Sequence, residues 1–248
     1  MKKNLYNNQF YQNQKYISLQ SASEILPVIL NILPKIQSAV DFGCGHGAWL
    51  KVLKDLGVNE IIGYDGNWVN EKDLLIPIEN FQKTDLKSLF CFDRRYDLAI
   101  SIEVAEHLPE NSAELFIQTL IKSSDIILFS AAIPGQGGTN HANEQWQSYW
   151  FKLFQKKGYT GLEIRHLFWS NIKINVYHRQ NIFLYVKNDT LSKFEYLQKN
   201  IIDQSALLID IVHPELHLKN IKKMKSSKYF LIQKFPFIAK IINKIRSS

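Results

Sequence analysis

Two carboxylates and two histidines in the middle of the chain have the residue types and spacing for proton transfer or metal binding. Glu103, Glu106 and His107 lie three residues and one residue apart, and His141 follows further on. If the chain turns helical after residue 102, the first three share one face. Together with His141 they could take a proton from a hydroxyl group or hold Mg²⁺ or another divalent ion. Alternatively, these side chains only shape a pocket.

A glycine-rich stretch, VDFGCGHG at 40–47, is a second candidate site. Gly43, Gly45 and Gly47 let the backbone turn tightly and approach a ligand, and a predicted helix begins directly after them. Glycines at such a turn can also serve packing alone. A dinucleotide-binding fingerprint would have its third glycine where Ala48 stands, although alanine is sometimes tolerated there.

Acidic residues stand where the next predicted strands end. Asp65 and Gly66 follow the second strand, and an acidic side chain there can accept both hydroxyls of a ribose. Asp85 and Leu86 follow a short third strand, and the SIEVAEHL run at 101–108 closes the fourth. Ligands of open α/β sheets bind at the carboxyl ends of strands, so these residues should meet the glycine loop.

Strand-like and helix-like segments alternate between residues 38 and 187. Several strand candidates are continuous apolar runs, which is typical of parallel strands covered by helices on both faces. The pattern predicts an α/β fold with a doubly wound, mainly parallel sheet. The expected strands are 38–42, 60–65, 96–102, 125–133, 162–169 and 181–187, and the expected helices between them are 48–56, 112–121 and 144–157.

The GGTNHANEQWQSYW run at 137–150 divides into a loop and a helix. Asn143 is expected to cap the helix, with Glu144 in its first turn. The aromatic residues behind them recur at helical spacing, so we expect them to pack in the core. The functional part of the run is then the flexible loop that ends at His141.

The chain divides into three segments. Residues 1–37 form an N-terminal segment, 38–187 the main domain, and 188–248 a helical, basic extension. A capping-box pattern at 21–24 predicts a helix over 22–32 that Pro34 ends. Tyr11 and Tyr16 could fold over the ligand as a lid, or belong to a disordered terminus.

The positive charge is confined to the C-terminal segment. Nine lysines and arginines follow Glu215 with no acidic residue, so removing them from the net charge of +7 leaves −2 for residues 1–215. A nucleic-acid-binding surface is therefore not expected. Cys44 and Cys91 form no metal motif, no 18-residue apolar run occurs in the sequence, and we expect no signal peptide. We expect a cytoplasmic protein.

The basic extension mixes lysines with apolar residues over 219–246, and Pro236 interrupts it. Basic segments of this kind can lie on an anionic membrane surface. The extension could instead pack on its own domain or contact a partner enzyme. We therefore expect a peripheral contact with the inner face of the cytoplasmic membrane or with a partner, as alternatives to a packed helix.

The motifs VDFGCGHG, YDG, TDL and SIEVAEHL, in this order, resemble those of class I S-adenosylmethionine-dependent methyltransferases. The resemblance covers residues 38–187 and implies a Rossmann-like, seven-stranded sheet with its last strand antiparallel. It also implies that S-adenosylmethionine is the cofactor and S-adenosylhomocysteine the product. The implied cofactor contacts are Asp41, Gly43, Cys44 and Gly45 to the methionine part, Asp65 with Gly66 to the ribose, Asp85 with Leu86 to the adenine, and Glu103 near the methyl donor.

Four further motifs resemble a subgroup that methylates building blocks of bacterial surface polysaccharides. They are DGNWV (65–69), H-x-N-E-Q-W-x-x-Y-W (141–150), YHRQN (177–181) and VHPE (212–215). This resemblance implies a small-molecule or glycan-precursor acceptor. From the residue types and their positions we expect methylation on oxygen, with His141 as the base, helped by Glu106 or His107. The rival functions are N-methylation of a small amine, amide or amino sugar, and a catalytically inactive S-adenosylmethionine-binding module. An RNA methyltransferase and a nicotinamide enzyme fit less well.

Overall fold

The structure is a computed structural model that describes residues 8–88, 94–193, 197 and 209–234. The chain divides into two compact units, Met1–Ile211 and Val212–Ser248. The sheet and both candidate sites belong to the first unit, which continues beyond Lys187, where the sequence places the end of the main domain.

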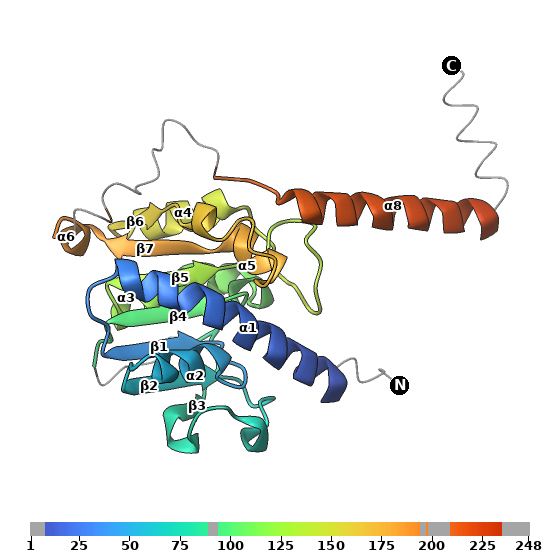
Figure 1. The fold of residues 1–248 in the computed structure, drawn as a ribbon. Helices are drawn as coiled ribbons and strands as arrows, with labels where there is room; N and C mark the ends of the chain where they lie inside the picture. Colours follow the sequence, from blue (N-terminus) through green and yellow to red (C-terminus); the bar gives the residue numbers. More distant parts are fainter. Residues whose placement is uncertain (1–7, 89–93, 194–196, 198–208, 235–248) are drawn as a thin grey trace. The chain divides into compact units, whose positions relative to one another are not determined.

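A seven-stranded sheet in the order β3-β2-β1-β4-β5-β7-β6 forms the centre of the first unit (Figure 1). The first five strands in this order pair in parallel, and β7 runs antiparallel to both of its neighbours. The doubly wound, Rossmann-like fold expected from the sequence is confirmed. The strands are β1 (Ser38–Phe42), β2 (Glu60–Asp65), β3 (Phe81–Lys83), β4 (Leu98–Ile102), β5 (Ile126–Ser130), β6 (Tyr159–Leu162) and β7 (Phe183–Lys187).

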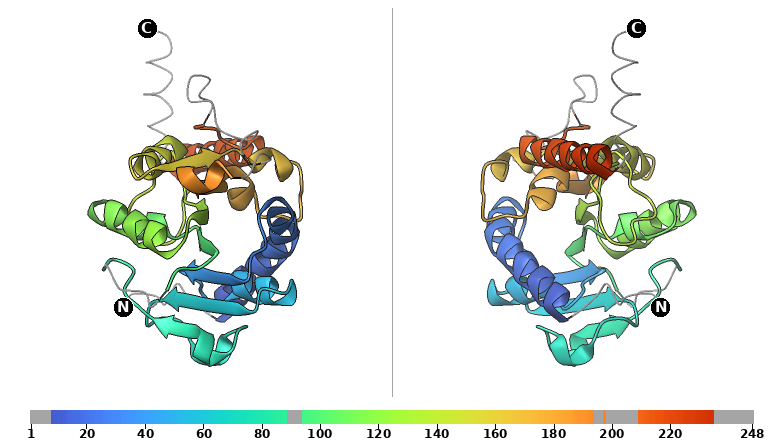
Figure 2. Two further views of the ribbon diagram at one scale, coloured as in Figure 1. Left: turned by 90° about the vertical axis from the view of Figure 1, so that its left-hand side faces the viewer. Right: turned by 90° about the vertical axis from the view of Figure 1, so that its right-hand side faces the viewer.

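Helices cover both faces of this sheet, as the two side views show (Figure 2). One buried apolar cluster joins the sheet to α1 (Asn8–Ile32) and α2 (Ala48–Asp55). A second cluster, on the other face, joins it to α3 (Ala113–Ser123) and α4 (Gln147–Gln155). The short helices α5 (Val176–Asn181) and α6 (Asn188–Leu191) flank β7. Strands buried on both faces explain the continuous apolar runs in the sequence.

Helix α1 starts earlier than its sequence pattern predicts. The capping-box serine, Ser21, lies inside the helix and is buried, and its Oγ accepts a hydrogen bond from the Asn175 N–H at 3.0 Å. Helix α1 ends at Ile32, before Pro34, as expected. The helix start predicted from the capping-box pattern is wrong, because the Ser21 hydroxyl bonds Asn175 and does not cap the first turn of a helix.

The sixth strand lies before the predicted segment, at Tyr159–Leu162, and 165–167 form a short 3₁₀ helix instead. The Arg165 guanidinium is buried, where it pairs with Glu163 and donates to the Ile209 carbonyl at 3.0 Å. These bonds satisfy the buried Arg165 charge, and they hold this residue outside the sheet. For this reason the strand-like run at 162–169 does not continue β6.

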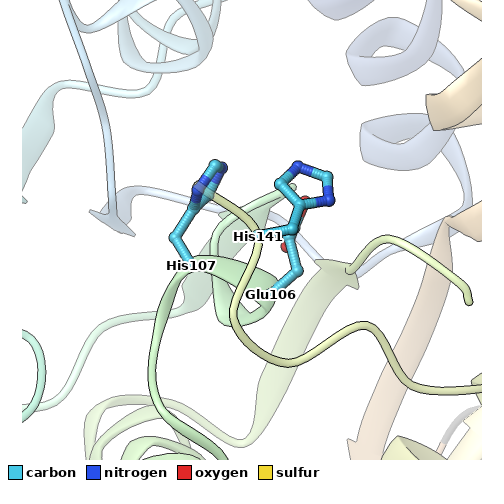
Figure 3. A group of neighbouring side chains, drawn as sticks. All are labelled: Glu106, His107 and His141. Carbon is cyan, nitrogen blue, oxygen red and sulfur yellow. The ribbon is translucent and has the colours of Figure 1, made fainter. Parts of the chain in front are cut away.

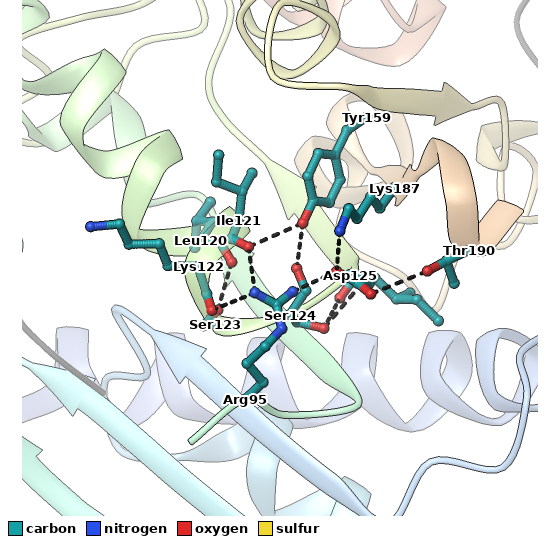
Figure 4. A network of polar contacts seen from close by, with 11 residues as sticks. Arg95, Leu120, Ile121, Lys122, Ser123, Ser124, Asp125, Tyr159, Lys187 and Thr190 are labelled. Carbon is teal, nitrogen blue, oxygen red and sulfur yellow. Dashed lines mark hydrogen bonds and ion pairs between the residues drawn. The ribbon is translucent and has the colours of Figure 1, made fainter. Parts of the chain in front are cut away.

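A polar network joins the end of α3 to the start of β5 (Figure 4). Arg95 donates to the carbonyls of Ile121 and Lys122 and pairs with Asp125 at 2.5 Å. The Tyr159 hydroxyl donates to the Ser124 carbonyl at 2.7 Å. These contacts satisfy carbonyls that the helix end leaves without partners.

The second unit contains helix α8 (Pro214–Lys234), which begins at a proline, a residue favoured in the first helical turn. Within the described residues, no helix is both long enough and apolar enough to cross a membrane. The later part of the predicted basic extension, including Pro236, lies outside the described residues. A contact of this segment with a membrane or a partner stays a prediction.

The buried His178 of α5 makes folding stability depend on pH. Its ring lies edge-on to Trp49 at 5.7 Å, its Nδ1 has no partner among the described residues, and burial lowers its pKa to about 4. The unfolded chain therefore binds this proton first as pH falls below about 6.5. We expect His178 to remove about 3 kcal/mol of stability between pH 7 and 4.

Urea unfolding at both pH values measures this loss, with His178→Phe expected to lack it. The exposed His166 is the matched control, because His166→Phe should retain the loss. An equal pH-dependent loss in the wild type and in His178→Phe would contradict the assignment.

Candidate active site

The glycine loop turns at the carboxyl end of β1 with three glycines in the left-handed region. Gly43, Gly45 and Gly47 have φ of 81°, 53° and 80°, which a side chain would strain. A Cβ on Gly43 would lie 2.3 Å from Val104 Cγ2, so Val104 fills the space that the missing side chain leaves. The loop thereby packs directly against the segment that follows β4.

Two aspartates lie beneath and beside this loop. Asp65 Oδ2 accepts a hydrogen bond from the Gly45 N–H at 2.7 Å, and Oδ1 accepts from the Gly66 N–H at 2.6 Å. Asp41 is buried, and its Oδ2 has no partner among the described residues. Burial, and next the nearby Asp65 charge, raise the pKa of Asp41 well above its usual value. Burial also raises the pKa of Asp65, against the effect of its backbone donors.

The other predicted cofactor residues extend from the same loop along the strand ends. Cys44 is buried, and burial raises the pKa of its thiol. Asp85 is exposed in a turn where it accepts from the Lys87 N–H, while Leu86 is buried. Trp68, which the sequence reasoning did not assign, covers Gly66 so closely that a Cβ there would lie 2.2 Å from its ring.

Glu103 does not share a helix face with Glu106 and His107. It takes a left-handed φ of 55°, unusual for a residue other than glycine, and the helical turn spans only Ala105–His107. The Glu103 N–H donates to the Ser130 carbonyl at 3.0 Å, which ties this turn to β5. The helical turn begins two residues after Glu103, so Glu103 lies outside it and cannot share a helix face with Glu106 and His107.

The Glu103 carboxylate is held by two amides that the sequence reasoning did not assign. Its Oε2 accepts from Gln136 Nε2 at 2.7 Å, and its Oε1 accepts from Asn181 Nδ2 at 3.1 Å. Asn181 belongs to the YHRQN motif, so the motif itself was the available signal. No spacing in the sequence relates α5 to the end of β4, and only the fold brings them together.

Glu106, His107 and His141 converge, as the sequence predicts (Figure 3). One potential ligand atom from each lies within 4.8 Å of the others, and the two imidazole rings meet edge to face at 4.8 Å. The backbone explains the approach of His141, because the Ala142 and Asn143 N–H groups both donate to the Glu106 carbonyl. The loop between β5 and α4 is thus hydrogen-bonded to the turn after β4.

Burial favours the uncharged forms of two members of this cluster. Burial, and next the negative charge of Glu103, raise the pKa of Glu106 well above its usual value. Burial, and next the charge of His141, lower the pKa of His107. Glu106 Oε2 is buried with no partner among the described residues. Two imidazoles and a carboxylate are also a donor set that zinc, manganese or iron could use.

A family model described as a methyltransferase domain matches residues 12–176. The chain belongs to this family. It is a methyltransferase, and the predicted S-adenosylmethionine-dependent class is confirmed at the level of family and fold. Comparison with curated proteins found no match.

Solved structures share the fold at low sequence identity. The sugar N-methyltransferase KedS8 from a Streptoalloteichus species is 11% identical with a TM-score of 0.57, over 75% of this chain and 97% of that one. DesVI from Streptomyces venezuelae is 12% identical with a TM-score of 0.53, over 73% and 96%. The plantazolicin methyltransferase BpumL, solved with S-adenosylhomocysteine, is 17% identical with a TM-score of 0.51, over 73% and 88%.

The strand-end site fits the cofactor in two respects. The buried, unpartnered Oδ2 of Asp41 offers an acceptor for a donor group of a ligand. The glycine loop exposes backbone without side chains, and Gly45 is open, because no atom lies within 4 Å of the point where a Cβ would stand. A charged amino acid part joined to a nucleoside needs both an acidic acceptor and close backbone approach.

Gly43→Ala should abolish cofactor binding in this methyltransferase. The new Cβ would displace Val104 and add left-handed strain of about 1–2 kcal/mol. The matched control is Gly57→Ala, since Gly57 has a similar φ of 92° but no atom within 4 Å of its Cβ position. Calorimetric titration with S-adenosylhomocysteine should show binding by the wild type and by Gly57→Ala, and no binding by Gly43→Ala. Equal affinities of the two variants would contradict the role given to the Val104 contact.

Proposed function

We propose that this methyltransferase methylates a hydroxyl oxygen on a sugar, a nucleotide-sugar or a phosphate-bearing precursor of a bacterial surface glycan. The convergence of Glu106, His107 and His141 supports oxygen as the acceptor. A hydroxyl must lose a proton when it is methylated, which calls for a base or a metal, whereas a neutral amine attacks without one. The cluster begins two residues after Val104, which packs on the glycine loop.

In this proposal the strand ends hold the cofactor. Asp41 with the Gly43, Cys44 and Gly45 backbone would bind its methionine part, Asp65 with Gly66 its ribose, and Asp85 with Leu86 its adenine, while Glu103 would lie beside the methyl donor. When bound, S-adenosylmethionine supplies an activated sulfonium methyl group. The remaining task of the protein is to place an acceptor oxygen in line with it, which can contribute several kcal/mol.

His141 is the proposed base. Its Nδ1 lies 2.8 Å from Glu144 Oε1, so its Nε2 is the nitrogen left to receive the hydroxyl proton. Burial raises the pKa of Glu106 and lowers the pKa of His107, which favours the uncharged form of each, and an uncharged group can hydrogen-bond to the acceptor.

Three of the four subgroup motifs supply side chains to this site, which supports a glycan-type acceptor. DGNWV supplies Asp65 and Trp68, the run after residue 140 supplies His141, and YHRQN supplies Asn181. The fold alone leaves the acceptor open, because DesVI, BpumL and a sugar N-methyltransferase all share it. N-methylation of an amino sugar is therefore the second candidate.

His141→Ala should lower turnover by roughly 10²–10⁴-fold, the usual contribution of a general base. Turnover is measured as S-adenosylhomocysteine released with a panel of hexoses, nucleotide-sugars, sugar phosphates and amino sugars. His166→Ala, at an exposed histidine outside the cluster, is the control and should match the wild type. Methylation of amino sugars alone, with His141→Ala fully active, would support N-methylation instead. Binding of the cofactor without turnover on any acceptor would indicate an inactive module.

Removal of divalent ions should leave turnover unchanged. Glu106, whose pKa is raised, favours its protonated form, which is a poor metal ligand. Turnover is compared before and after dialysis against EDTA. Loss of activity that Mn²⁺, Zn²⁺ or Mg²⁺ restores would assign the cluster to metal binding and not to proton transfer.

A further inference from the structure

Glu144 is not part of helix α4, although its sequence position suggests the first turn of that helix. Helix α4 begins at Gln147, and Asn143 makes no cap, because its Oδ1 accepts from Gln145 Nε2. The Glu144 carboxylate turns back into the preceding loop. It accepts from the Gly135 N–H at 2.8 Å and from the Gly137 N–H at 3.1 Å, and it contacts His141 Nδ1 at 2.8 Å.

These contacts determine which imidazole nitrogen of His141 carries hydrogen. Glu144 Oε1 already accepts the Gly137 N–H, and an ionised carboxylate has no hydrogen to donate. A 2.8 Å contact between this oxygen and Nδ1 is attractive only when Nδ1 is the donor. Neutral His141 therefore carries its hydrogen on Nδ1 and has its lone pair on Nε2.

The loop backbone is bent around this carboxylate. Gly135, Gly137 and Asn140 all have left-handed φ values, of 79°, 72° and 60°. Glu144 and His141 are mostly shielded, with side chains 21% and 12% exposed, so water competes little for their contact. The sequence suggested a flexible loop at 137–141, but in the structure the Glu144 carboxylate hydrogen-bonds to the backbone of this loop and to His141.

Gly138 completes the arrangement on the far side of the ring. A Cβ on Gly138 would lie 2.0 Å from His141 Nε2. Any larger residue at position 138 would displace the His141 ring and its Nε2 lone pair from this position. Gly138 has no left-handed φ, so its replacement by alanine tests this steric constraint without added backbone strain.

We propose that Glu144 is the positioning residue of His141, holding the ring in the loop and fixing the tautomer whose Nε2 accepts a proton. The inference rests on the proposed function for its chemical consequence. The acceptor hydroxyl gives its proton to Nε2, its oxygen lone pair forms the bond to the methyl carbon, and the carbon–sulfur electrons return to sulfur. Glu144 keeps its hydrogen bond to Nδ1 throughout and stabilises the imidazolium, which then releases its proton to solvent.

The tautomer is tested without any acceptor. In ¹⁵N-labelled full-length protein, two-bond ¹H–¹⁵N correlation spectra at alkaline pH report which nitrogen of each histidine is protonated, and His141→Gln assigns the signal. We expect hydrogen on Nδ1 in the wild type and on Nε2, the commoner form in water, in Glu144→Ala. Glu79→Ala is the control, since Glu79 is an exposed carboxylate that contacts no histidine in the described residues. An unchanged His141 tautomer in Glu144→Ala would overturn the inference.

Turnover gives the second measurement. Glu144→Ala should lower kcat roughly a hundred-fold with little change in KM for S-adenosylmethionine. Glu144→Gln, which retains one acceptor oxygen but no charge, should recover part of this loss. The double variant Glu144→Ala/His141→Ala should be no slower than His141→Ala alone, because both changes remove one function.

The two proposals fail in different ways. Additive losses in the double variant would overturn the positioning role, whereas a fully active His141→Ala would overturn the base and leave the tautomer measurement standing. Gly138→Ala separates a change at His141 from a loss of folding. It should shift the His141 signals and lower kcat, while the unfolding midpoint in urea stays near that of the wild type. Unchanged His141 signals in Gly138→Ala would contradict the described ring position.

Discussion

The contact of Val104 with the bare Cα of Gly43 holds the two halves of the active site together. A glycine at the end of β1 lets this side chain approach to where a Cβ would otherwise stand. The cofactor loop lies on one side of the contact, and Glu103, Glu106 and His107 lie on the other. β1 and β4 are neighbours in the sheet, at the point where the strand order reverses, so their pairing and this apolar contact together keep the two halves adjacent.

Buried polar groups arranged around this contact carry the proposed chemistry. The Glu103 carboxylate is satisfied by Gln136 and Asn181, and the Glu144 carboxylate by two glycine N–H groups and His141. Asp41 Oδ2 and Glu106 Oε2, by contrast, are buried without partners among the described residues. Leaving such groups unsatisfied costs about 1–3 kcal/mol each, a cost that proteins accept where a ligand supplies the missing bond. The two satisfied carboxylates bind the loops to one another, and the two unsatisfied ones are acceptors that a bound ligand could use.

Local sequence was a sound guide where a single element determines the outcome. The bounds of β1 and β2 follow from their apolar runs, and Asp65 lies at the end of β2 as its position suggests. Predictions were wrong where a distant partner competes for the same side chain. Ser21 bonds Asn175 and does not cap a helix, and Arg165 draws its segment away from β6. In both cases the competing partner lies far away in the sequence, so no local pattern could reveal it.

The sequence by itself indicated the class of enzyme, because its ordered glycine and acidic motifs resemble those of class I S-adenosylmethionine-dependent methyltransferases. It also identified Glu106, His107 and His141 as residues with the right chemistry. Only the tertiary structure decided how they are arranged. The conformation of the Gly135–His141 loop depends on a carboxylate that turns back from the start of α4, and the sequence pattern assigned that carboxylate to the helix dipole. A hydrogen bond between loop and side chain depends on direction and distance, and residue types in order along a chain specify neither.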